Sequence, residues 1–336
     1  MEVPYYDLPE EAIAQVPAEP RDSARLLNAL TEPPEHLKVT DLPSLVCEGD
    51  VLVVNTSRVV PARLALRKPT GGEAEVLLVE PLPGRPGCWE AMVRPARRLS
   101  PGMELLTAAG TPVVMVGGRL PNGNREVHSL VGDLAAYGEV ALPPYIHTPL
   151  ADPERYQTVY SDQPGSVAAP TAGLHLTGRL LEACRARGAQ VVQVDLAIGP
   201  GTFKPIKAAR VEEHEMQAER YFVPGRTWRA CQEAKRKGCR VVAVGTTSVR
   251  ALESAGATGN LEGKTELYIR PGHDFSVVDV LMTNFHQPRS TLLVLLEAFA
   301  GERWRDIYAL ALAEGYRFLS FGDAMVVARD VRARGR

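Results

Sequence analysis

The sequence has no uninterrupted apolar segment of the length that a membrane-spanning helix requires, although 45% of its 336 residues are hydrophobic. Its start, from Met1 to Pro4, lacks the basic residues and the apolar core of a secretory signal peptide. We therefore expect a cytoplasmic globular protein that does not bind membranes. The length is sufficient for two domains, each with a core of its own.

Metal-ligand spacing is also absent from the sequence. The chain has five cysteines and seven histidines, and no pair of them forms a motif such as CxxC or HExxH. An odd number of dispersed cysteines is typical of free thiols in a reducing compartment. We therefore expect no metal site. The cysteines are Cys47, Cys88, Cys184, Cys231 and Cys239.

A strong net charge is missing as well, since the formal value is −2. This value argues against a protein that binds polyanions over its whole surface, but it does not exclude RNA, because binding depends on local clusters of charge. Further basic clusters lie at 235–240 and 329–336, and any cluster is alternatively a solvated face. The two candidates for RNA contact are Arg94, Arg97 and Arg98, and Lys204, Lys207 and Arg210.

Two patterns of secondary structure divide the chain. Between residues 61 and 149, short alternating apolar runs are separated by glycine and proline turns, which predicts a small all-β barrel. After residue 149, helices and strands alternate, which predicts an α/β fold with a largely parallel or mixed sheet. The buried strand at 51–54 should join that sheet. We therefore predict an α/β catalytic domain, residues 1–60 and 150–336, with an inserted β-barrel domain at 61–149.

Three polar segments, at 170–175, 244–250 and 282–288, stand where a predicted strand or loop leads into a helix. Open α/β sheets bind ligands at the carboxyl ends of strands, and the amides at a helix start favour anions. The second segment suits a carboxylate or a phosphate, although it lacks P-loop spacing. In the third, Phe285 could stack a base and Asn284 could read its edge. Each segment is alternatively a capped turn with packed side chains.

His175 and His286, in the first and third of these segments, could transfer protons near neutral pH. Asp323 lies in a glycine turn between two predicted short strands. We predict that the three segments line one pocket. The residues predicted to bind its ligand are Thr171, Ala172, Gly173, Gly245, Thr246, Thr247, Ser248, Arg250, Thr283, Asn284 and Phe285.

The segment from Val191 to Gly201 is similar to the glycine-rich strand end of a conventional methyltransferase. It is one glycine short, and the residues that follow, from Thr202 to Ile206, do not open a helix. Because the required strand, turn and helix are not present in order, we reject this interpretation.

Taken together, these segments resemble the S-adenosylmethionine:tRNA ribosyltransferase-isomerase family nearly from end to end. The chain departs from the family pattern at Ala197, where a histidine is usual, and at Leu176, where phenylalanine is usual. An indispensable acid or base at position 197 is therefore not expected. The segments that carry the resemblance are Tyr6–Pro9, Gly49–Asn55, Arg58–Arg63, Pro143–Ile146, Tyr156–Tyr160, Pro170–His175, Gly245–Arg250, Thr283–His286 and Ser320–Met325.

The resemblance implies that the ribosyl carbons of S-adenosylmethionine are transferred to 7-aminomethyl-7-deazaguanine at the wobble position of tRNA. Adenine and methionine are released, and no metal is required. The reaction needs a base beside the sulfonium, an acid near the purine and exclusion of water. From their residue types, we expect His175 or His286 to transfer protons and Asp323 to serve as an orienting carboxylate. Arg250 and the 245–248 turn would hold the methionine carboxylate or a tRNA phosphate, and the two basic clusters would bind tRNA.

Two alternatives from other functional classes remain at this point. A conventional RNA methyltransferase would produce S-adenosylhomocysteine rather than adenine. A non-catalytic RNA-binding module built on the β barrel would leave the three polar segments without a purpose. For either function, or for the ribosyltransferase, we expect a monomer.

Overall fold

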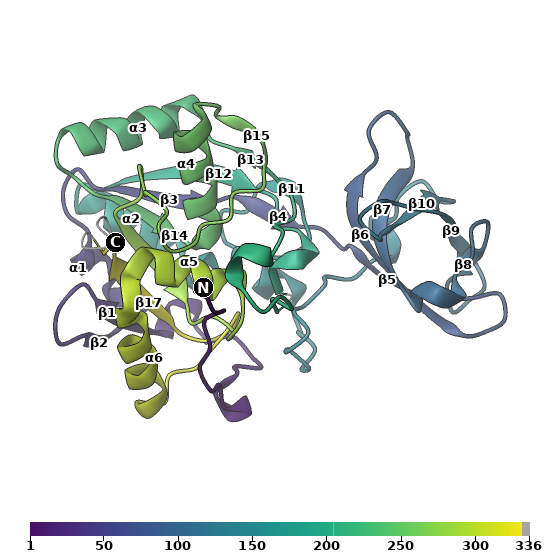
Figure 1. The fold of residues 1–336 in the computed structure, drawn as a ribbon, viewed down its shortest axis with the longest axis horizontal. Coiled ribbons are helices and arrows are strands. Elements are labelled where there is room, and N and C mark those ends of the chain that lie inside the picture. Colours follow the sequence, from purple (N-terminus) through teal and green to yellow (C-terminus); the bar gives the residue numbers. More distant parts are fainter. Residues whose placement is uncertain (204, 331–336) are drawn as a thin grey trace. The chain divides into compact units, whose positions relative to one another are not determined.

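The computed structural model describes residues 1–203 and 205–330, and these fold into two compact units (Figure 1). The first unit comprises residues 1–58, 143–163 and the described residues from 169 onward. The second comprises residues 59–142 and 164–168. Residues 143–149, which the sequence suggested as the end of the inserted domain, therefore lie in the first unit.

A nine-stranded sheet forms the core of the first unit, in the order β15-β13-β12-β3-β14-β16-β17-β1-β2. Strands β12, β3, β14 and β16 are parallel neighbours, and β17 is parallel to β1 but antiparallel to β16. The predicted mixed α/β sheet is thus confirmed. The strands are β1 (Arg25–Ala29), β2 (Glu35–Lys38), β3 (Val51–Asn55), β12 (Gln190–Leu196), β13 (Glu219–Phe222), β14 (Val241–Val244), β15 (Glu262–Thr265), β16 (Val280–Asn284) and β17 (Ala324–Ala328).

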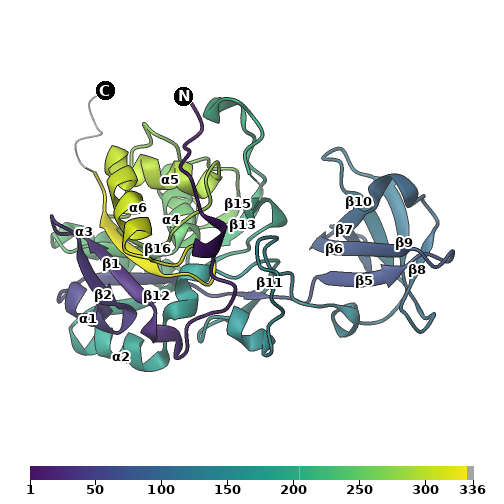
Figure 2. The same cartoon turned by 90° about the horizontal axis from the view of Figure 1, so that it is seen from below.

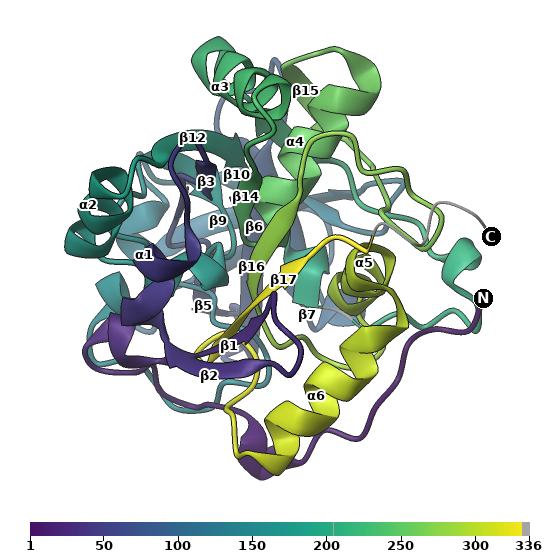
Figure 3. The ribbon, with the colours of Figure 1, turned by 90° about the vertical axis from the view of Figure 1, so that its left-hand side faces the viewer.

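Helices α1 and α2 lie on one side of this sheet, and α4, α5 and α6 lie on the other (Figures 2 and 3). The α-helices are α1 (Leu42–Leu45), α2 (Gly178–Ala186), α3 (Gly225–Arg236), α4 (Thr246–Thr258), α5 (Thr291–Ala300) and α6 (Trp304–Ala313). Short 3₁₀ helices are η1 (Glu10–Ala12), η2 (Arg21–Ser23), η3 (Val39–Asp41), η4 (Ala96–Arg98), η5 (Ala135–Tyr137), η6 (Pro153–Tyr156), η7 (Thr171–His175), η8 (Pro200–Phe203), η9 (Val211–Glu213) and η10 (Gly301–Arg303). In the part of the chain that the structure describes, no helix is both long and apolar enough to cross a membrane.

Local sequence signals explain where two of these helices begin. The Thr177 hydroxyl accepts a hydrogen bond from the Leu180 amide at the start of α2, and Ser290 accepts one from Leu293 at the start of α5. Each side chain satisfies an amide that has no partner within its helix. Gly188 follows α2 with a φ of 88°, a conformation that favours glycine over other residues.

Strand β3 lies between β12 and β14, and all five of its residues are buried. Leu52 and Val54 face a core shared with Leu180 and Leu181 of α2. Because the central strands are covered on both faces, they read in the sequence as continuous apolar runs rather than as alternating ones.

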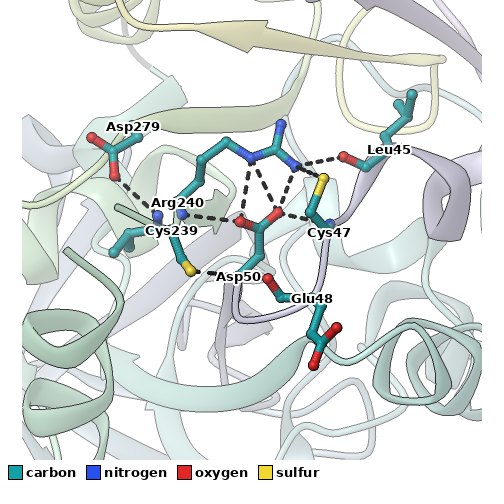
Figure 4. Close-up of polar contacts among 8 residues, drawn as sticks. Leu45, Cys47, Glu48, Asp50, Cys239, Arg240 and Asp279 are labelled. Atoms are coloured by element: carbon teal, nitrogen blue, oxygen red, sulfur yellow. Dashed lines mark hydrogen bonds and ion pairs between the residues drawn. The ribbon is translucent and has the colours of Figure 1, made fainter. Parts of the chain in front are cut away.

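An ion pair joins the amino ends of β3 and β14 (Figure 4). The Asp50 carboxylate accepts hydrogen bonds from the backbone amides of Cys47 and Arg240, at 2.9 Å each. It also accepts from Nε of Arg240, at 3.1 and 3.3 Å, while Nη2 of Arg240 donates to the Leu45 carbonyl. Asp50 is buried. The cluster lies at the amino ends of β3 and β14, whereas the polar segments lie at the carboxyl ends of the strands.

The second unit is a closed antiparallel barrel in the order β10-β7-β6-β5-β8-β9, as the alternating runs predicted. Strand β5 shows the pattern clearly, because Leu64 and Leu66 are buried between exposed neighbours. The barrel strands are β5 (Arg63–Arg67), β6 (Glu73–Pro81), β7 (Cys88–Arg94), β8 (Glu104–Leu106), β9 (Pro112–Arg119) and β10 (Arg125–Ser129). Strands β4 (Ser57–Val59) and β11 (Gln163–Ser166) form a separate two-stranded sheet.

Candidate active site

The three polar segments meet at the carboxyl ends of β14 and β16. The Gly245 amide, which follows β14, donates to the Met282 carbonyl of β16 at 2.8 Å. The Thr171 hydroxyl of η7 donates to Oδ1 of Asn284, at the end of β16, at 2.9 Å. A Cβ built on Gly245 would lie 3.7 Å from the Cβ of Ala172. The segments therefore adjoin as predicted, but they border two neighbouring cavities rather than one.

The first cavity lies beside the start of α4. It encloses about 370 Å³ of empty space, partly open to solvent, and Thr246, Thr247 and Arg250 of α4 line it together with Tyr268. Three of these residues carry buried polar atoms without a hydrogen-bond partner among the described residues, namely Oγ1 of Thr247, Nη2 of Arg250 and the Tyr268 hydroxyl. Unpaired buried polar atoms are costly, so their gathering at one cavity favours a polar ligand.

Arg250 is held by a buried partner that the sequence did not reveal. Its Nη1 forms an ion pair with Glu219 of β13, and its Nε donates to the Leu267 carbonyl at 3.2 Å. Glu219 also accepts from the Gly199 amide at 2.9 Å and from the Thr202 hydroxyl at 3.3 Å. Glu219 therefore already balances the charge of the Arg250 guanidinium. Arg250 can offer a ligand hydrogen bonds but little net charge. Glu219 is the first residue of β13, a strand whose residues alternate between buried and exposed in the structure.

The hydroxyl groups of the 245–248 turn differ in their availability. Thr246 and Thr247 line the first cavity, where the first turn of α4 carries the partial positive charge of a helix start. Ser248 is fully buried, and its hydroxyl donates to the Val244 carbonyl at 2.8 Å. The Ser248 hydroxyl is therefore bound to the backbone of β14 and is not available to a ligand. The sequence had suggested that Ser248 would bind the ligand.

The second cavity shares Thr202 and Leu292 with the first. Its lining includes Asn284 and His286 of the third polar segment, as well as Thr171. Three other polar residues of this lining were not among the predicted site residues, namely Tyr145, Ser290 and Ser320. Tyr145 and Ser320 lie in segments that carry the resemblance, and Ser290 caps the helix that follows the third polar segment.

His286 is fixed on several sides. Its amide donates to the Tyr308 hydroxyl at 2.8 Å, and its carbonyl accepts from the Tyr6 hydroxyl at 2.6 Å. Nε2 of the ring lies 2.9 Å from Oγ1 of Thr283, which is the ring's one hydrogen-bond partner among residues 1–203 and 205–330. Burial lowers the pKa of His286 to about 3, so the ring is neutral at physiological pH and can accept a proton.

His175 occupies a position behind the cavity wall. Its Nε2 accepts a hydrogen bond from the Asn284 amide at 3.1 Å, and it lines neither cavity. Burial lowers its pKa to about 4, and the nearby charge of Arg317 adds to this effect. The chain of contacts from His175 through Asn284 to Thr171 orients the Asn284 side chain. Of the two histidines predicted to transfer protons, His286 is therefore the one that lines a cavity.

Asp323 is buried, and its carboxylate holds the backbone of two other segments. Oδ1 accepts from the Arg25 amide at 3.0 Å and Oδ2 from the Arg317 amide at 2.8 Å. Within the described part of the chain, no hydrogen bond joins this carboxylate to His175 or His286. The orienting role expected for Asp323 toward a histidine therefore finds no support in its contacts.

Phe285 is fully buried in an aromatic cluster. Its ring stacks on Phe318, with centroids 4.7 Å apart and an interplanar angle of 29°, and it meets Tyr308 and Tyr316 edge-on. Phe285 also borders the second cavity, but its ring is fully buried, which leaves no exposed face for a nucleobase. Packing of the core, rather than base stacking, explains this aromatic residue.

The basic residues expected to bind tRNA are exposed wherever the structure describes them. Arg94 ends β7, and Arg97 and Arg98 lie in η4 of the barrel unit. In the first unit, Lys207 and Arg210 are exposed, and Nε of Arg210 lies 3.4 Å from Glu212. Lys204 and residues 331–336 lie outside the described residues.

Several remaining expectations concern residues without a predicted catalytic role. The five cysteines are free thiols, as predicted. Leu176 is fully buried in the core beneath the sheet, so a phenylalanine is not needed there to fill space. Ala197 follows β12, and its amide donates to the Arg220 carbonyl at 2.9 Å.

The fold defines an α/β protein with two adjoining cavities at the ends of parallel strands and a separate antiparallel barrel. Residues 3–327 match the model of the family described as queuosine biosynthesis protein. A relative from Thermus thermophilus, named S-adenosylmethionine:tRNA ribosyltransferase-isomerase, is 51% identical over 96% of this chain and 97% of its own. A relative of the same name from Rubrobacter xylanophilus is 48% identical, with 96% of each chain covered.

The crystal structure of the S-adenosylmethionine tRNA ribosyltransferase from Thermotoga maritima is also similar. It has a TM-score of 0.55 and 35% sequence identity, and the match covers 96% of this chain and 98% of that one. The chain therefore belongs to the queuosine biosynthesis protein family.

Proposed function

We propose that this chain transfers and isomerises the ribosyl moiety of S-adenosylmethionine onto 7-aminomethyl-7-deazaguanine at the tRNA wobble position. The products would be epoxyqueuosine-tRNA, adenine and methionine. Membership of the family supports the reaction. The proposal is placed at this site because the three family segments meet at two adjoining cavities. The first of these is lined by buried polar atoms that have no hydrogen-bond partner among the described residues.

The two cavities suit the two ends of S-adenosylmethionine. In this proposal the methionine carboxylate and amine lie in the first cavity, against Thr247, Arg250 and Tyr268. The balanced Arg250–Glu219 pair suits this end, because methionine carries one charge of each sign. The adenosine end lies in the second cavity, beside Asn284. The sulfonium would then stand near the shared border.

His286 is the proposed proton carrier. The neutral ring would remove a proton from the methylene beside the sulfonium, which that cation acidifies. Because burial lowers the pKa of His286 to about 3, the protonated ring is a strong acid and would pass its proton to the departing adenine. His175 would act as a positioning residue through Asn284. The neutral exocyclic amine of the tRNA base then attacks the opened ribosyl chain and loses a proton to solvent. The carbon beside the sulfonium bonds to the former anomeric carbon to close the five-membered carbon ring, and the alkoxide formed there displaces methionine as the epoxide closes.

The reaction itself needs no metal, so S-adenosylmethionine is the only co-substrate in this proposal. The free thiols and the tRNA substrate favour a cytoplasmic location. We propose a monomer, which sedimentation in the presence and absence of tRNA would check.

Product analysis tests the proposed function. The purified chain is incubated with S-adenosylmethionine and tRNA that carries the aminomethyl base, and small molecules are separated by mass spectrometry. Equal amounts of adenine and methionine are expected, and a chelator should not change the turnover rate. Release of S-adenosylhomocysteine would instead support a methyltransferase, and an unchanged co-substrate would support a binding module.

A further inference from the structure

Cys88, Glu126 and His128 lie together on the outer face of the barrel. Strands β7 and β10 are antiparallel neighbours, and their register places Cys88 directly opposite His128. Ala91 of β7 and Val127 of β10 are fully buried in the barrel core. Because side chains alternate along a strand, the other three residues share the opposite, outward side.

The polar atoms of these three side chains converge. Sγ of Cys88 lies 3.1 Å from Nδ1 of His128, and Nε2 of His128 lies 3.0 Å from Oε1 of Glu126. One possible ligand atom from each residue lies within 4.8 Å of the other two. Thiolate sulfur, imidazole nitrogen and carboxylate oxygen are the three ligand types that zinc binds in proteins, at about 2.0–2.3 Å.

The surrounding charges form a second, independent observation in favour of a cation. Glu80 of β6 lies opposite Glu90 of β7, and Glu90 lies opposite Glu126 of β10, so three carboxylates form a row across three strands. Like charges directly opposite each other destabilise a sheet. Arg85 balances part of this charge, since its Nη1 lies 2.9 Å from Oε1 of Glu126. Glu90 accepts hydrogen bonds from the neutral side-chain amides of Asn122 and Asn124, so its charge adds to the negative potential beside the cluster.

We propose that this face of the barrel binds a zinc ion through Cys88, Glu126 and His128, with solvent completing the coordination. As the sulfur–zinc bond forms, the thiol proton passes to solvent, and the imidazole binds through one nitrogen in its neutral form. The ion would join β7 to β10. The site lies within the barrel unit and takes no part in the proposed reaction. Sequence spacing hides it, because Cys88 and His128 are separated by 40 positions and meet only through strand pairing.

Metal titration of the full chain tests the proposal. The protein is freed of metal with a chelator, and Zn²⁺ binding is followed by calorimetry. We expect one equivalent for the wild type and for the control Cys47→Ser, which changes an exposed cysteine outside the cluster. Cys88→Ser and His128→Gln should weaken binding by more than about tenfold, since loss even of a group that only supports a metal ligand costs about 10–100-fold. Co²⁺ should produce a thiolate charge-transfer absorption that Cys88→Ser abolishes.

Alkylation of the wild type gives a second measurement that needs no variant to fold. Zn²⁺ should slow the reaction of Cys88 with iodoacetamide by more than about tenfold and leave the rate at Cys47 unchanged. The proposal is overturned if the wild type binds no stoichiometric zinc, or if zinc protects neither cysteine. It is also overturned if Cys88→Ser retains the wild-type affinity or the cobalt absorption.

Discussion

At the scale of single residues, Thr247 offers the sharpest test of the first cavity. Its hydroxyl is buried and has no hydrogen-bond partner among the described residues. Thr247→Val keeps the shape of the side chain and removes this group. Because no hydrogen bond within the protein is removed, the free energy of unfolding should change by less than about 0.5 kcal/mol. The Kd for S-adenosylmethionine, measured by calorimetry, should rise about 5–10-fold, the equivalent of one hydrogen bond.

Ser248→Ala is the matched control for Thr247→Val. The Ser248 hydroxyl donates to the Val244 carbonyl inside the protein. Its removal should lower the free energy of unfolding by about 1 kcal/mol and leave the Kd for S-adenosylmethionine unchanged. If Thr247→Val binds the co-substrate as tightly as the wild type does, the polar end of the ligand lies elsewhere.

The two buried histidines should make the protein sensitive to acid. Burial lowers the pKa of His175 from 6.5 to about 4, and that of His286 from 6.5 to about 3. Below a pH of about 6.5 the unfolded chain therefore binds protons that the folded chain does not, so the free energy of unfolding falls as the pH decreases toward about 4. Urea unfolding at several pH values should show a shallower fall for His175→Gln. His147→Gln, at an exposed position, should keep the wild-type slope, and equal slopes for both variants would contradict this account.

At the scale of elements, the Asp50–Arg240 cluster links the amino ends of β3 and β14 (Figure 4). Asp50 is buried while the Arg240 side chain is 32% exposed, and Asp50 also binds two backbone amides, so its removal leaves both the guanidinium and the two amides without their acceptor. Asp50→Ala should therefore lower the free energy of unfolding by about 3–5 kcal/mol. Glu233→Gln breaks an exposed pair with Lys237, which solvent screens, so it should lower the free energy of unfolding far less than Asp50→Ala does. Urea unfolding of both variants measures the difference, and equal losses would show that Asp50 has no special role.

Elements with strong local signals were predictable from the sequence. The predicted buried strand β3 is confirmed, because an apolar run depends on a few adjacent residues. The caps Thr177 and Ser290 are local signals of the same kind. Strands β1 and β2, in contrast, were not recognised. Strand β1 pairs with β17, which lies near the other end of the chain, and such a long-range contact leaves little mark on a short segment. Strand β2 pairs with β1 at the edge of the sheet and is mostly exposed, so it has no apolar run.

In the candidate site, the positions of the three segments could be predicted from the sequence, whereas the directions of several side chains could not. The three segments meet as expected, because strand ends gather at one edge of a parallel sheet. The directions of the Ser248, Phe285 and Asp323 side chains could not be predicted, since each is set by a partner elsewhere. Those partners are the Val244 carbonyl, the Phe318 ring and the amides of Arg25 and Arg317.

At the scale of the whole molecule, a chain with a net charge of −2 must bind a polyanion through local basic surface. Removing the cations that neutralise phosphates weakens binding and flattens its dependence on salt, by a slope of about 0.9 for each phosphate that is no longer neutralised. We expect the apparent KM for tRNA to rise, and its salt slope to flatten, when a cluster that binds tRNA is replaced by alanine. The KM for S-adenosylmethionine should not change. The two clusters to compare are Arg94, Arg97 and Arg98, and Lys207 and Arg210.

A matched change of charge separates direct binding from general electrostatics. Replacing the exposed residues Arg226, Arg229 and Arg236 of α3 by alanine removes as much charge as replacing the barrel cluster does. This control should keep the wild-type salt slope. If the salt slope and the apparent KM for tRNA of both cluster variants equal those of the control, both clusters are solvated faces and tRNA binds elsewhere.

The central claim is that ribosyl carbons, and not the methyl group, move from S-adenosylmethionine to tRNA. Two samples of the co-substrate, one labelled with ¹³C in the ribose and one in the methyl group, are given separately to the chain with tRNA that carries the aminomethyl base. The modified nucleoside is then isolated and its mass is measured by mass spectrometry. We predict that the ribose label is recovered whole in the nucleoside and that the methyl label remains in the released methionine. Recovery of the methyl label in tRNA, with the ribose label in S-adenosylhomocysteine, would contradict the account.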